Sequence, residues 1–115
     1  MSVRTTLPLG FADLEPFVEQ WAGATVDARM YARASADMAG IRRFYEVAVA
    51  RGAEALEYCA QFPLDAMPDD AALLFRLMLG LAQASIAVEI HGQPRAPGTP
   101  WPNSITLQRG PSPFG

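Results

Sequence analysis

The sequence predicts an all-α fold, and three observations support this prediction. Half of the 115 residues are apolar, and alanine, which loses no side-chain entropy in a helix, is common. Apolar residues recur every three to four positions, as on one face of a helix, within segments that proline and glycine bound. The stretch 71–91 is apolar around nearly its whole circumference, so it needs cover on more than one side. We therefore expect a single helical domain over residues 1–91, because this length corresponds to one domain.

Two short helices are expected at the N-terminal end of this domain. The first covers about 11–22, where Pro16 fits a first turn because proline lacks the N–H that would have no partner there. The second covers about 25–34, with the Thr25 side chain as its N-cap. Ser35 is a candidate N-cap for the segment that follows. The sequence leaves open whether the second and third helices are continuous or separate.

The two main helices are expected at about 36–62 and 69–91, joined by a short loop. Because a short loop leaves neighbouring helices side by side, they should form an antiparallel hairpin. Gly52 costs helix stability, so together with nearby alanines it indicates a close approach of two helices at that level. The face of the first main helix expected to be buried comprises Met38, Ile41, Tyr45, Ala48, Val49, Gly52, Leu56, Cys59 and Ala60.

The second main helix has two apolar arcs on nearly opposite sides. One arc, with Leu73, Leu77 and Leu81, matches the apolar face of the first main helix. The other would forgo on the order of 1.5–3 kcal/mol for each large side chain left exposed. Its cover can come from the N-terminal helix, from the C-terminal arm or from a second copy. We predict a homodimer resembling a four-helix bundle, with a self-sufficient monomer as the alternative. The interface candidates on this arc are Phe75, Leu79, Ile86 and Ile90.

Residues 92–115 form an irregular arm that differs in composition from the domain. The arm contains six of the ten prolines and four of the nine glycines, so no helix is expected in it. Trp101 and Ile105 have the spacing of docking anchors and are further interface candidates. We expect the arm to dock either on its own domain or on a partner chain, a choice that the sequence leaves open.

Charge and residue inventory exclude several classes of function. The net charge of −3 predicts no attraction to nucleic acid or to anionic membranes. All nine basic residues are arginine, which excludes a lysine Schiff base and a Walker A loop. The single Cys59 cannot form an intramolecular disulfide, and no signal peptide is evident, so we expect a cytoplasmic protein. The longest apolar run in the last helix, 77–82, is too short for a membrane span.

No cofactor or metal site is predicted. A di-iron carboxylate bundle requires Glu-x-x-His motifs, whereas the single histidine, His91, follows Glu89 by two residues. Glu89 lies between the two apolar arcs, so we expect an ion pair with an arginine. Cys59 lies on the packed face, where a thiol behaves as a small hydrophobic group.

Two functional hypotheses remain from these observations. The first is a non-catalytic protein–protein interaction or accessory protein that acts as a homo-oligomer. The alternative is a small helical bundle that binds an apolar ligand, or a minor enzyme, with candidate ligand contacts at Arg76, Gln83, Glu89 and Tyr45. A closed pocket that contains Glu89 or Arg76 would favour the alternative. A solid core with Glu89 paired to arginine would favour the first hypothesis.

Overall fold

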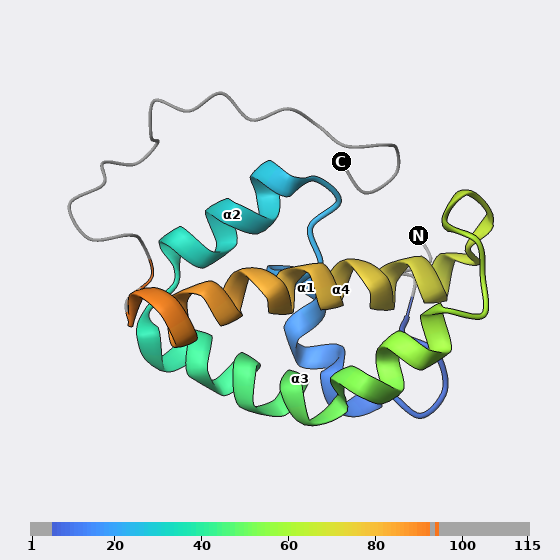
Figure 1. The fold of residues 1–115 in the computed structure, drawn as a ribbon, viewed down its shortest axis with the longest axis horizontal. Coiled ribbons are helices and arrows are strands. Elements are labelled where there is room, and N and C mark those ends of the chain that lie inside the picture. The colour runs from blue at the N-terminus through green and yellow to red at the C-terminus, as the bar shows by residue number, and fades with distance from the viewer. Residues whose placement is uncertain (1–5, 93, 95–115) are drawn as a thin grey trace, which may run out of the picture.

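The computed structural model describes residues 6–92 and 94, and every regular element within them is helical (Figure 1). This confirms the predicted all-α class. The interface candidates Trp101 and Ile105 lie outside the described residues. The elements in chain order are η1 (Ala12–Phe17), α1 (Val18–Trp21), α2 (Val26–Ser35), α3 (Met38–Cys59), η2 (Leu64–Ala66), α4 (Asp69–Ser85) and η3 (Ile86–His91).

The helix α4 is the centre of the fold, because α1, α2 and α3 all pack against it. Figure 1 shows α3 and α4 side by side as the two longest helices, with α2 beside the C-terminal half of α4. The Trp21 ring of α1 stacks on the Phe44 ring of α3, with 4.7 Å between ring centroids. Both side chains are almost completely buried, as are Leu74 and Leu77 of α4. Burial of these large apolar groups is the main favourable term for the fold.

The N-terminal region is less regular than the predicted helix over 11–22. It begins as the 3-10 turn η1 and becomes α-helical only over α1. Pro16 lies inside η1 and has no N–H to donate, which removes an α-helical hydrogen bond at that point. Arg51 of α3 holds this segment in place: it donates to the Asp13 carboxylate at 2.6 Å and to the Gly10 carbonyl at 2.7 Å. Its guanidinium also lies over the Phe11 ring.

Helices α2 and α3 are separate, which answers the question left open by the sequence. The predicted N-cap of α2 is confirmed, because the Thr25 side chain accepts a hydrogen bond from the Ala28 N–H. Ser35 is not the N-cap of α3; its hydroxyl donates to the Tyr31 carbonyl at 2.7 Å. Ala36 adopts an extended conformation, and Asp37 caps α3 by accepting from the Gly40 N–H at 2.8 Å. The carboxylate cap thus starts a new helix two residues beyond the predicted start.

The buried face of α3 differs in part from the predicted one. Val49 and Leu56 were expected inside but are 49% and 51% exposed, and Ala60 is also exposed. Phe44 and Ala55 are fully buried instead. The cause is tertiary, because the aromatic side chains of α1 and η1 pack on the Phe44 side of the helix. The buried face is therefore turned toward these aromatic groups.

The sequence predicted a close helix approach at Gly52, but in the structure the close approach is at Gly80 of α4. A Cβ added at Gly52 would meet only the Leu81 Cδ2 atom at 3.9 Å, an ordinary contact. A Cβ added at Gly80 would collide with the backbone carbonyl of Trp21. Gly80 therefore allows α1 to lie directly against α4. The sequence could not distinguish the two glycines, because both lie within helices and near alanines.

The C-terminal end of the last helix agrees with its predicted stop. After α4 the chain continues as the π-helical turn η3, and this helical segment ends at Gly92, whose φ of 67° lies in the left-handed region. Within the described residues one helix, Asp69–Ile90, is long and apolar enough to cross a membrane by length and composition alone. The core helix of a soluble protein has the same composition, and 50% of the most apolar window of this helix is buried.

Candidate functional site

The four predicted ligand contacts lie in two different places. Tyr45 of α3 and Glu89 of η3 are brought together, with the Tyr45 hydroxyl donating to the Glu89 carboxylate at 2.7 Å. This hydrogen bond raises the pKa of Tyr45. Within the described residues Glu89 therefore meets a tyrosine and not an arginine, because the packing of α3 against the end of the last helix brings Tyr45 to this position. The pair is exposed, so it is a surface contact between two helices.

Arg76 and Gln83 lie on a different flank of α4, and both are half-buried. Burial lowers the pKa of Arg29 in α2, and the charge on Arg76 lowers it further. Arg29 also donates to the Gly23 carbonyl at 2.7 Å. Arg33 follows one helical turn later, and burial lowers the pKa of its guanidinium group. Only 5% of Arg29 and 8% of Arg33 is exposed.

Among the described residues, three buried polar atoms on α2 and α4 have no hydrogen-bond partner: Arg33 Nε, Arg76 Nε and Gln83 Oε1. Most buried polar groups in proteins have partners, and leaving one unsatisfied costs about 1–3 kcal/mol. We refer to Arg29, Arg33, Arg76 and Gln83 as the arginine cluster. Sequence reasoning missed its two α2 members. Their spacing of four residues places them on one helix face, but only the packing of α2 shows that this face is buried.

The interface candidates of α4 and η3 lie at the edge of an apolar surface. Phe75, Leu79 and Ile86 are half-buried, whereas Ile90 is 73% exposed. A cavity of about 240 Å³ connects this edge to α3, since its walls include Phe75 and the exposed Leu56. The other walls of the cavity are Cys59, Ala60, Phe62, Leu64 and Met67. We refer to Val49, Leu56, Leu64, Phe75, Leu79, Ile86 and Ile90 together as the α3–α4 apolar face.

Cys59 forms the inner wall of this cavity and is buried, as expected from its place on α3. Its thiol lies 3.7 Å from the Ala71 carbonyl oxygen, which accepts a weak hydrogen bond. Burial raises the pKa of the thiol, so the nucleophilic thiolate is disfavoured at neutral pH. The position supports a packing role for the sulfur.

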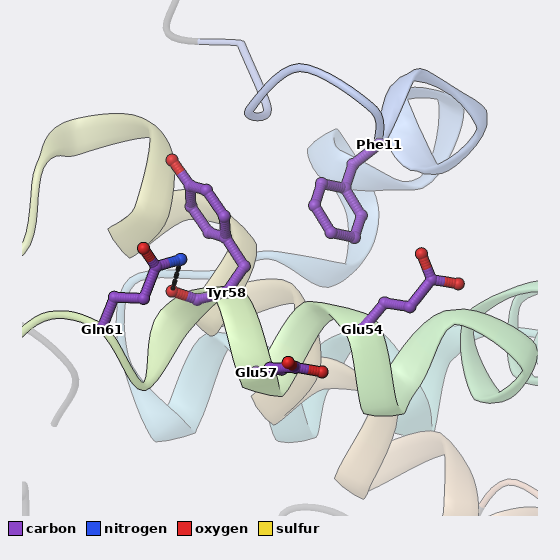
Figure 2. Close-up of a pocket in the computed structure, with 5 residues that line it drawn as sticks. All are labelled: Phe11, Glu54, Glu57, Tyr58 and Gln61. Carbon is purple, nitrogen blue, oxygen red and sulfur yellow. Dashed lines mark hydrogen bonds between the residues drawn. The ribbon is translucent and has the colours of Figure 1, made fainter.

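A second hollow, of about 370 Å³, lies on the other side of α3 and is open to solvent (Figure 2). It is lined by Phe11, Glu54, Glu57, Tyr58 and Gln61, and the Gln61 amide donates to the Tyr58 carbonyl at 3.1 Å. Neither this hollow nor the apolar cavity is lined by Arg76 or Glu89. Among the described residues, no group of three or more His, Cys, Asp and Glu side chains is arranged to hold a metal ion.

Comparisons with protein-family models, with curated proteins and with solved structures found no match to this chain.

Proposed function

We propose that this protein is a non-catalytic interaction module that acts as a homodimer through the α3–α4 apolar face. The observation that supports this proposal is the exposure of large apolar side chains on α3, η2 and η3. Val49, Leu56, Leu64 and Ile90 are each 49–73% exposed. Fully burying such a side chain contributes about 1.5–3 kcal/mol relative to full exposure, so a partner that covers this face gains stability. Contiguous exposed apolar surface is typical of protein interaction sites.

The spacing of the α4 and η3 residues is compatible with a second copy as the partner. In a two-fold dimer with antiparallel α4 helices, Leu79 of one copy faces Ile86 of the other, and Phe75 faces Ile90. The axis then passes near Ala82, which is exposed and small enough for close packing of the helices. Helices α3 and α4 of each copy would form the hairpin half of a four-helix bundle.

The test is the mass of the protein in solution. We expect a dimer at tens of micromolar by sedimentation equilibrium or light scattering. The double variant Leu56→Glu with Ile90→Glu should be monomeric with an unchanged helical circular dichroism spectrum, because both side chains are exposed within one copy. Ala50→Glu is the matched control, since Ala50 is an exposed α3 residue outside the apolar face, and it should remain dimeric. A monomeric wild-type protein would refute the homodimer.

A further inference from the structure

We propose that the apolar cavity between α3 and α4 is a binding site for a small neutral aromatic molecule of one or two rings. The cavity lies where the end of α3, the loop that contains η2 and the first turns of α4 meet (Figure 1). Its walls are the side chains of Leu56, Cys59, Ala60, Phe62, Leu64, Met67 and Phe75. All of these walls come from one copy of the chain, so the inference goes beyond the proposed homodimer.

The depth of the cavity is the first argument. Its inner wall is Cys59, of which only 5% is exposed, and the walls Met67 and Phe75 are half-buried. The exposed Leu56 and Leu64 form its outer walls. A molecule in this cavity therefore contacts protein on several sides, as in the concave sites that bind small ligands, whereas a flat apolar face covers only one side.

The size of the cavity is the second argument, and it limits the ligand. The volume is about 240 Å³. An apolar protein cavity of about 150 Å³ is large enough to bind benzene. The cavity between α3 and α4 therefore has room for a substituted ring or for two fused rings. Drug-sized ligands occupy pockets of about 300–1,000 Å³, so a larger molecule does not fit.

The chemistry of the walls is the third argument. None of the wall residues is charged, and the Cys59 thiol donates its weak hydrogen bond to the Ala71 carbonyl oxygen at 3.7 Å. A charged ligand would lose its hydration without a replacement partner, which favours a neutral ligand. The rings of Phe62 and Phe75 can pack edge-to-face or offset against a ligand ring, and the Met67 sulfur adds a favourable contact with an aromatic group.

The experiment uses Cys59, the single cysteine of the chain, as a reporter inside the cavity. The rate at which methyl methanethiosulfonate modifies this thiol is measured on the full-length protein with increasing toluene. We expect the rate to fall to about one tenth when toluene reaches roughly ten times its dissociation constant, because only protein without bound toluene reacts. Benzoate, a charged molecule of similar size, should leave the rate unchanged.

Two variants locate the binding. Ala60→Phe adds a ring at an exposed wall position and should abolish the protection by toluene. Ala50→Phe is the matched control, since Ala50 is an exposed α3 residue outside the walls, and it should be protected like the wild type. A wild-type rate that does not change with toluene would overturn the proposal. Equal protection by benzoate, or equal protection of Ala60→Phe, would also overturn it.

A third variant separates this proposal from the homodimer. Ile90→Glu changes the α3–α4 apolar face but lies outside the cavity walls. Its Cys59 thiol should be protected by toluene as in the wild type, whatever the state of association of either protein. Loss of protection in Ile90→Glu would contradict a site formed within one copy.

Discussion

The central helix α4 contacts α3 on one side and α2 on another, and these two interfaces have opposite chemistry. The α3 side buries apolar groups such as Leu74 and Ile41 completely and keeps its interhelical Tyr45–Glu89 hydrogen bond at the exposed rim. The α2 side buries guanidinium groups, and two of these have unsatisfied Nε atoms. We infer that the α3 interface supplies stability, whereas the unpartnered buried polar atoms of the α2 interface reduce it.

The largest expected effect comes from the apolar core of the α3 side. Phe44→Ala should destabilise the protein by about 3–5 kcal/mol, because the substitution leaves a cavity beside Trp21. Urea denaturation followed by circular dichroism measures this loss. Arg43→Ala, an exposed neighbour on the same helix, should change stability by no more than about 0.5 kcal/mol. Similar losses for both variants would contradict the assignment of stability to the apolar side.

The next effect concerns the close approach between α1 and α4. Gly80→Ala should destabilise by about 1–3 kcal/mol, because the new methyl group collides with the Trp21 carbonyl and displaces backbone. Gly52→Ala is the matched control in α3, where a methyl group has room. This control should stabilise by about 0.5–1 kcal/mol through helix propensity. Stability changes of opposite sign for the two variants in thermal denaturation would confirm that only Gly80 lies at a close helix approach. An unchanged melting temperature for Gly80→Ala would refute it.

A smaller effect of opposite sign is expected on the α2 side. Gln83→Met should stabilise the protein by about 1 kcal/mol in chloride buffer, because it removes a buried carbonyl oxygen that lacks a donor. Gln20→Met, at an exposed position of α1, should leave the free energy of unfolding nearly unchanged. A destabilised Gln83→Met protein would show that the α2 interface contributes stability through this side chain.

The smallest effect is a pH dependence that arises on the α3 side. Burial raises the pKa of the Cys59 thiol, so the folded state keeps its proton where the unfolded thiol ionises. Stability should therefore decline as the pH rises above the ordinary thiol pKa of about 8.5. The raised pKa of Tyr45 acts only at higher pH. Urea midpoints at pH 7.5 and 9.5 should differ more for wild type than for Cys59→Ala, and equal differences would contradict the prediction.

Local sequence signals predicted the helices well and the site only in part. The cap at Thr25 and the stop at Gly92 were predictable because each depends on a few adjacent residues. The choice between Ser35 and Asp37 as the N-cap of α3 was not predictable from the sequence, because both side chains can accept the same kind of hydrogen bond. Arg76 and Gln83 were recognised as candidate ligand contacts, but the buried Arg33 of α2 was missed, because its burial depends on how a separate helix packs.

The sequence by itself determined the all-α class, the approximate helix boundaries and the shortage of polar surface on the last helix. These properties follow from periodicity, capping and composition, which act over a few residues. Only the tertiary structure decided that Gly80 admits α1, that Glu89 meets Tyr45, and that Arg33 is buried beside α4. These contacts join residues far apart in the chain, and several helix orientations satisfy the same local pattern until side-chain packing selects one.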